Sequence, residues 1–170
     1  METSKRITET TASGYPASTD IPRRRSLFTG TGIFFAAAAL VASPAWGGGP
    51  SSALLDAIRQ VESGGRGAET PDGDGGKAIG AYQIHRAYWQ DATEWLRVDW
   101  PYADARDPVK ARRAVVAYMD RYGRNFQRET GREATAEVYA RMHNGGPRGW
   151  KKKATLPYWN RVKRVMEDAQ

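Results

Sequence analysis

The stretch that decides the fold is residues 54–65, which read LLDAIRQVESGG. Its apolar residues recur at i, i+1, i+4 and i+7, a spacing that places them on one face of an α-helix. These residues are Leu54, Leu55, Ile58 and Val61. Glu62 closes this helix, and Gly64-Gly65 ends it. Because the apolar face partly desolvates a neighbouring carboxyl group, we expect a raised pKa for Glu62, which keeps a proton available near neutral pH.

An acidic, glycine-rich segment follows this helix. From Arg66 to Lys77 almost no residue is apolar, which predicts a loop or a short, weak β-hairpin. Asp72 and Asp74 lie in this segment, and an aspartate on a solvated loop should stay ionised. A protonated carboxyl group and an ionised one in separate environments are what glycoside hydrolysis requires. An isolated glutamate at this place is more often a surface residue near a helix end than a catalyst, so the interpretation of Glu62 depends on the rest of the chain.

The remaining segments predict a mostly α-helical single domain. Residues 79–84 return to the core and lead into a helix over about 86–96. Asp107-Pro108 starts a third helix, with aspartate as N-cap and proline in the first turn, and Gly123 is predicted to end it. The predicted buried face of that helix comprises Val109, Val115, Val116, Met119 and Tyr122. Further helices are predicted over about 133–142 and from about Pro157.

The first 45 residues have the composition of a targeting segment. Three arginines at 23–25 precede an apolar run from Ile33 to Ala42, and small residues follow it, as in a secretory signal peptide. Paired arginines ahead of the apolar run are also typical of the twin-arginine export route. The run is shorter than the roughly 20 residues that span a bilayer, and an uncleaved N-terminal anchor is the alternative. We therefore predict a secreted or periplasmic protein without stable membrane insertion after cleavage, divided into a signal peptide (1–45), a linker (46–51) and a folded domain (52–170).

Composition narrows the possible partners. The chain has a formal net charge of +7 and no cysteine. The positive charge favours anionic partners such as cell-wall polymers, nucleic acid or acidic lipid. The lack of cysteine excludes a thiolate nucleophile and a cysteine-ligated zinc site. His85 and His143 are the only histidines and lack the helical spacing of a catalytic metal site, so we expect neither a metal nor another cofactor.

Several stretches, in order and spacing, resemble a known family. Glu62–Gly65, then a loop and Ala78–Ile84, are similar to the signature shared across the lysozyme superfamily, which includes bacterial lytic transglycosylases. The stretches that resemble the invertebrate-type, or destabilase-like, lysozymes more specifically are residues 87–92, 116–123, 140–149 and 154–162. The resemblance covers about residues 52–166 and implies an α+β lysozyme-like fold, mostly helical, with a short β-hairpin or loop after the first helix.

The resemblance also implies roles for individual residues. Glu62 matches the family's general acid, and the second carboxylate falls at Asp74 or Asp72, of which Asp74 is preferred. The positions that match segments lining the sugar-binding cleft are Tyr82, Gln83, His143, Asn144 and Gly145. For Gly145 a purely structural turn is an equal alternative. The places where animal members carry disulfide cysteines are occupied here by Gly65, Ile79 and Trp150.

Together these features predict an exported muramidase that cleaves the β-1,4 bond between N-acetylmuramic acid and N-acetylglucosamine in the glycan strands of peptidoglycan. One alternative is a lytic transglycosylase that uses Glu62 alone and forms 1,6-anhydro products. Another is a non-catalytic module that binds cell wall or nucleic acid through its charge. Two candidate aspartates in the loop, Asp72 and Asp74, favour hydrolysis. The complete motif around Glu62 argues against a module that only binds, so nucleic acid is not expected as a partner. No residue indicates the isopeptidase activity of some relatives, or an oligomeric state.

Overall fold

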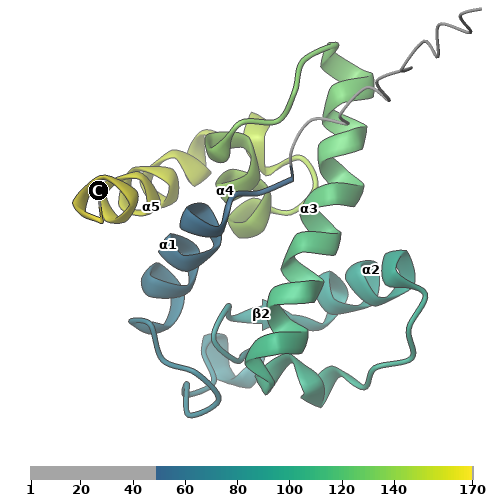
Figure 1. The fold of residues 1–170 in the computed structure, drawn as a ribbon, viewed down its shortest axis with the longest axis vertical. Helices are drawn as coiled ribbons and strands as arrows, with labels where there is room; N and C mark the ends of the chain where they lie inside the picture. The colour runs from purple at the N-terminus through teal and green to yellow at the C-terminus, as the bar shows by residue number, and fades with distance from the viewer. Residues whose placement is uncertain (1–48, 170) are drawn as a thin grey trace, which may run out of the picture. The chain divides into compact units, whose positions relative to one another are not determined.

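The computed structural model describes residues 49–169. The predicted signal peptide over 1–45 and residues 46–48 of the predicted linker lie outside this range. The described part contains helices α1 to α5, short 3₁₀ helices η1 to η4 and one two-stranded sheet, β1-β2. The predicted mostly helical α+β fold, with a hairpin after the first helix, is thus confirmed (Figure 1).

Helix α1 (Ser52–Ser63) forms as its sequence predicts. The Ser51 side chain accepts a hydrogen bond from the Leu54 N–H at 3.2 Å and caps the N-terminus. Gly64 ends the helix with a φ of 63°, the left-handed region that favours glycine. The apolar face is buried at Leu54, Leu55 and Ile58. The helix therefore delivers Glu62 to the edge of the core in its last turn.

A small hairpin follows the acidic loop. The loop contains η1 (Asp74–Gly76), and the antiparallel strands β1 (Ala78–Ile79) and β2 (Ile84–His85) pair Ala78 with His85 and Ile79 with Ile84. Gly80 opens the turn between the strands with a φ of 73°. A Cβ atom at this position would lie 2.0 Å from the Ala105 carbonyl oxygen in η2 (Tyr102–Arg106), so the hairpin can approach η2 this closely only with glycine here.

Helices α2 (Arg86–Leu96) and α3 (Pro108–Thr130) pack against each other. The Asp107 carboxylate accepts hydrogen bonds from the Val109 and Lys110 N–H groups at 2.8 and 2.9 Å, which confirms the predicted start of α3. The predicted face of α3 is wrong at two positions, since Val109 and Val116 are exposed.

The predicted end of α3 at Gly123 is also wrong, because the helix continues to Thr130 and ends at Gly131, which has a φ of 69°. Gly123 is instead a contact point in the helix interior. A Cβ atom there would lie 2.9 Å from the ring of Tyr139 in α4, so the glycine lets α3 and α4 approach closely. This packing outweighs the helix-breaking tendency of glycine, which amounts to about 1 kcal/mol.

Helix α4 (Ala136–Gly145), η3 (Gly149–Lys151), η4 (Lys153–Thr155) and α5 (Leu156–Asp168) complete the fold. Helix α4 begins later than predicted, since Thr135 is its N-cap, and it continues through Asn144 and Gly145 before the turn begins at Gly146. Lys152 holds this end of α4 by donating a hydrogen bond to the Gly145 carbonyl oxygen at 2.7 Å.

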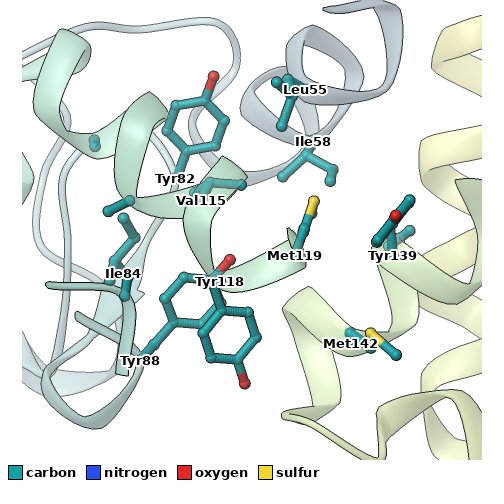
Figure 2. Close-up of a cluster of buried hydrophobic side chains, with 14 of the residues drawn as sticks. Leu55, Ile58, Tyr82, Ile84, Tyr88, Val115, Tyr118, Met119, Tyr139 and Met142 are labelled. Carbon is teal, nitrogen blue, oxygen red and sulfur yellow. The ribbon is translucent and has the colours of Figure 1, made fainter. Parts of the chain in front are cut away.

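The core forms around α3. Helix α2 packs against α3, and α4 contacts both α3 and α5, while α5 also covers α1 (Figure 1). Figure 2 shows the side chains of Ile58, Tyr88, Tyr118, Met119 and Tyr139, from α1 to α4, meeting in one cluster. The Tyr88 and Tyr118 rings stack with centroids 3.6 Å apart. This core holds the end of α1 against α4 and α5.

Candidate active site

Glu62 lies in the last turn of α1 with its side chain 20% exposed. Burial raises the pKa of this carboxyl group above its usual value. Tyr158, Arg161 and His85 act against the burial and lower the pKa, in that order of size. Burial prevails, and the net result is a carboxyl group that holds its proton to higher pH than an ordinary glutamate.

His143 lies beside Glu62 and is almost fully buried, with 4% of its side chain exposed. Its Nε2 is 3.2 Å from the Tyr82 carbonyl oxygen, and its Nδ1 is 3.2 Å from the Tyr88 hydroxyl. A carbonyl oxygen can only accept, so Nε2 carries the hydrogen and Nδ1 accepts from the Tyr88 hydroxyl. Burial lowers the pKa of His143 to about 4, and the ring is neutral at neutral pH.

The approach of His143 to Glu62 is therefore not an ion pair under these conditions. Nε2 is 3.6 Å from Glu62 Oε1, beyond hydrogen-bonding distance, and its hydrogen points to Tyr82. A protonated imidazole at this distance would favour an ionised Glu62. The neutral ring instead packs next to the carboxyl group and contributes to the burial that raises the pKa of Glu62.

Tyr158 of α5 is the other buried polar neighbour of Glu62. Its hydroxyl interacts with the Glu62 carboxyl group and lowers the pKa of that group. The geometry nevertheless falls short of a regular hydrogen bond, and the Tyr158 hydroxyl has no regular partner among the described residues. Burial raises the pKa of Tyr158 well above its usual value, and the hydroxyl remains protonated. The Tyr158 hydroxyl can therefore donate a hydrogen bond to the Glu62 carboxylate when Glu62 loses its proton.

The two loop aspartates have different surroundings. Asp72 forms an ion pair with Arg106 of η2 at 2.6 Å and is 35% exposed. Asp74 is 64% exposed, and its Oδ2 atom lies 3.8 Å from Nε2 of His85. His85 also lowers the pKa of Glu62. The same side chain therefore interacts with Asp74 in the loop and with Glu62 at the end of α1. Asp74 is the aspartate whose carboxylate is open to a ligand.

The predicted cleft residues have mixed environments. Tyr82 has a buried side chain whose hydroxyl is 3.4 Å from Arg112, and it contributes its carbonyl oxygen to the site by orienting His143. Gln83 braces the hairpin turn by donating to the Pro71 and Gly80 carbonyl oxygens.

Two further predicted cleft residues lie at the end of α4. Asn144 is exposed. Gly145 packs so closely on Thr155 that a Cβ atom would lie 2.5 Å from its methyl group, which favours the structural interpretation of this glycine.

Sequence reasoning missed Tyr158, Tyr88 and Arg161 as neighbours of Glu62. Tyr158 and Arg161 lie within the stretch that resembles the lysozymes, yet no spacing in the sequence connects them to α1. Among residues 49–169, no group of three or more histidine, aspartate or glutamate side chains could hold a metal ion. In the same range no helix is long and apolar enough to cross a membrane.

Comparison with known proteins identifies the family. The sequence model of the Destabilase family matches residues 51–165. A lysozyme of Meretrix lusoria is 35% identical over 123 residues, which are 70% of this chain and 93% of the clam protein. Invertebrate-type lysozyme 6 of Caenorhabditis elegans is 38% identical over 121 residues, covering 66% of this chain and 85% of its own length.

Solved structures agree. The Meretrix lusoria lysozyme, in a crystal structure with Aeromonas hydrophila PliI, matches with a TM-score of 0.57 at 35% identity, covering 69% of this chain and 93% of that one. Tapes japonica lysozyme matches with a TM-score of 0.57 at 27% identity, and the match covers 68% of this chain and 89% of the Tapes japonica chain. The predicted resemblance is confirmed, and the chain belongs to the destabilase family of invertebrate-type lysozymes, as a glycoside hydrolase of the lysozyme type.

Proposed function

We propose that this enzyme is an exported muramidase that cleaves the β-1,4 bond between N-acetylmuramic acid and N-acetylglucosamine in peptidoglycan, with Glu62 as general acid and Asp74 as the second carboxylate. The observation that carries the proposal is the environment of Glu62, whose pKa is raised by burial next to a neutral imidazole. A general acid must hold its proton at working pH and release it as the bond breaks.

The residues around Glu62 suit both its protonated form before the bond breaks and its carboxylate form afterwards. Before reaction, burial favours the protonated form of the carboxyl group by raising its pKa. As the glycosidic bond breaks, the Glu62 proton passes to the leaving oxygen and a carboxylate remains. The Tyr158 hydroxyl and the Arg161 charge both favour that carboxylate, because each lowers the pKa of Glu62. A water molecule then attacks the sugar and returns a proton to Glu62, which restores the acid.

Asp74 suits the second role better than Asp72. The sugar develops an oxocarbenium-like positive charge, which an exposed carboxylate can stabilise or attack. The Asp72 carboxylate is already paired with Arg106 at 2.6 Å, whereas within residues 49–169 the nearest basic group to Asp74 is the His85 ring, at 3.8 Å. The His85 imidazole lies near Asp74 and also acts on the Glu62 carboxyl group, consistent with two carboxyl groups that face one substrate.

Digestion of purified peptidoglycan tests the reaction. We expect new reducing ends and products that have gained one water per bond broken. Products that are lighter by one water and have 1,6-anhydro ends would instead indicate the lytic transglycosylase reaction. A wild-type enzyme that releases neither product would contradict the proposal as a whole.

Export fits a substrate that lies outside the cytoplasmic membrane. We expect the predicted signal segment over 1–45 to be removed, leaving the domain that contains α1 to α5. The intact mass of the protein recovered outside the producing cells measures this. Recovery of a chain that still begins at residue 1, or retention of the protein in the cytoplasm, would contradict export with cleavage.

Replacement of Tyr158 tests the proposed role of its hydroxyl. Because Tyr158 lowers the pKa of Glu62, the Tyr158→Phe variant should move the alkaline limb of the pH profile to higher pH. The maximal rate should still fall about tenfold, since the Glu62 carboxylate formed on proton transfer loses its donor. Steady-state rates across pH on a soluble substrate measure both changes. The control is Tyr139→Phe, another buried tyrosine, in α4. An unchanged alkaline limb in Tyr158→Phe would refute the role.

A further inference from the structure

One surface away from Glu62 combines an exposed tryptophan with arginines. Trp95, in the last turn of α2, is 43% exposed. Two hollows of about 520 Å³ each, both lined by Trp95, lie along α3. We call this region the Trp95 surface; its residues are Trp95, Arg113, Val116, Arg121, Arg124 and Arg128. Cavities of a few hundred Å³ are large enough for a small ligand.

Trp95 is held in a fixed orientation. Its Nε1–H donates to Asp120 Oδ2 at 3.1 Å, and Asp120 Oδ1 accepts from Arg124 Nε at 3.0 Å. The Arg124 guanidinium lies 5.9 Å from the centroid of the Trp95 ring. An exposed aromatic ring that is already fixed loses little conformational entropy when a ligand stacks on it. Trp95 is the most exposed aromatic residue of helices α2 and α3. Its fixed position on the surface therefore contributes little to the packing of the core.

The α3 residues of this surface form one stripe. Arg113, Val116, Asp120, Arg124 and Arg128 follow one another at intervals of three or four residues, which places them on one face of the helix. At 1.5 Å per residue the stripe is about 22 Å long. It passes Trp95 near its middle, because Asp120 bonds to the Trp95 ring. An extended polymer could therefore contact the tryptophan and both ends of the stripe together.

The charges of the Trp95 surface are partly unbalanced. Arg121 is paired with Glu94 at 2.7 Å, and Arg124 with Asp120. Among the described residues, no carboxylate lies within ion-pair distance of Arg113 or Arg128. These two arginines occupy the ends of the stripe, on either side of Trp95 along α3. Arg113 lies 5.0 Å from the centroid of the Trp100 ring, and Arg128 donates a hydrogen bond to the Asn125 side chain. Both contacts are with neutral groups, so the pattern is one aromatic ring between two cations that have no carboxylate partner.

We propose that the Trp95 surface is a second binding site for a carboxylate-bearing glycan strand, which holds the peptidoglycan while the Glu62 site acts on it. A pyranose ring stacks on Trp95, and carboxylates of the peptide stems pair with Arg113 and Arg128. The substrate class rests on the proposed function. A polyol-phosphate polymer has no ring in its backbone to stack on Trp95. Single-stranded nucleic acid would need a continuous row of unpaired cations for its phosphates. The five arginines that line the hollows are Arg112, Arg113, Arg121, Arg124 and Arg128. Three of them, Arg112, Arg121 and Arg124, have carboxylate partners.

Binding of the full mature chain to insoluble peptidoglycan, stripped of attached phosphate polymers, tests the proposal. The Glu62→Gln background prevents turnover, so that binding can be measured without cleavage of the polymer. Sedimentation then measures the fraction bound. We expect Trp95→Ala to weaken binding about three- to tenfold and Trp95→Phe to weaken it less, because phenylalanine keeps an aromatic ring. The Arg113→Gln/Arg128→Gln double variant should bind less at low salt and show a flatter salt dependence.

Two controls separate this inference from loss of folding and from the proposed function. Arg164→Gln/Lys163→Gln on α5 removes the same charge outside the two hollows and should bind like the parent. In the chain with Glu62 intact, Trp95→Ala should cleave a short β-1,4-linked N-acetylglucosamine oligosaccharide at an unchanged rate. Unchanged peptidoglycan binding by Trp95→Ala would overturn the second site while leaving the proposed catalysis intact. Loss of binding on removal of phosphate polymers, or tighter Trp95-dependent binding to a single-stranded oligonucleotide, would overturn the assigned ligand.

Discussion

The Glu62→Gln variant should lose about 10³-fold or more of its activity on peptidoglycan, since a positioned general acid contributes about 10²- to 10⁴-fold. Glutamine keeps the size and shape of the side chain next to His143 but has no proton of suitable pKa to donate. Release of reducing ends from purified peptidoglycan measures the loss. The variant should still bind the polymer, because only the proton donor has been removed.

The pH profile gives a second, independent measure of the same residue. Catalysis requires protonated Glu62, so the rate should fall as pH rises through the pKa of this group. Burial raises that pKa, and the alkaline limb should lie above the usual range of a glutamate. His143, whose pKa is lowered to about 4, stays neutral throughout this range and should not produce the limb.

A matched control exists in the same part of the chain. Glu69 is an exposed carboxylate in the segment that follows α1, and Glu69→Gln should retain nearly full activity. Comparison of Glu62→Gln with Glu69→Gln separates the loss of one particular proton from the loss of one negative charge. Activity of Glu62→Gln within tenfold of the wild type would refute its role as general acid.

The sequence predicts most of the fold because local signals and tertiary packing agree there. The apolar period of α1, its serine cap and its glycine stop, and the Asp107-Pro108 start of α3 are all local features. The error at Gly123 has a non-local cause. Its lack of a side chain serves the contact with Tyr139 rather than a helix end, and no local pattern distinguishes these two uses of glycine.

The candidate site likewise has local features that the sequence predicts and non-local features that it does not. The raised pKa of Glu62 could be expected from its place beside an apolar helix face, which is a local property. The neutral state of His143 depends on the Tyr82 carbonyl oxygen and the Tyr88 hydroxyl, which are distant in sequence. The place of the Tyr158 hydroxyl beside Glu62 depends on the packing of α5 against α1. Neither could be predicted, because the sequence does not specify which faces of the helices meet.

The choice between Asp72 and Asp74 shows how one tertiary contact distinguishes two residues that look equivalent in sequence. Both are aspartates followed by glycine in one loop. The structure adds Arg106 of η2, which pairs with Asp72 and leaves Asp74 exposed. The carboxylate with a structural partner and the carboxylate open to solvent should therefore respond differently to the same substitution.

The Asp74→Asn variant should lose about 10²- to 10³-fold in the rate of hydrolysis, the usual cost of removing one group that stabilises transition-state charge. Asparagine is nearly the same size but cannot neutralise or attack an oxocarbenium-like sugar. The matched variant is Asp72→Asn. It breaks a partly exposed ion pair worth about 0–1 kcal/mol, so it should lower stability slightly and activity far less than Asp74→Asn.

Product analysis of both variants decides how many carboxylates the reaction needs. If Asp74 holds the second role, the residual products of Asp74→Asn should appear slowly and still contain one added water. Full activity in Asp74→Asn with reduced activity in Asp72→Asn would transfer the role to Asp72. Full activity in both, with 1,6-anhydro ends, would mean that Glu62 acts alone. In that case the ion pair of Asp72 with Arg106 and the approach of Asp74 to His85 would serve only to shape the loop.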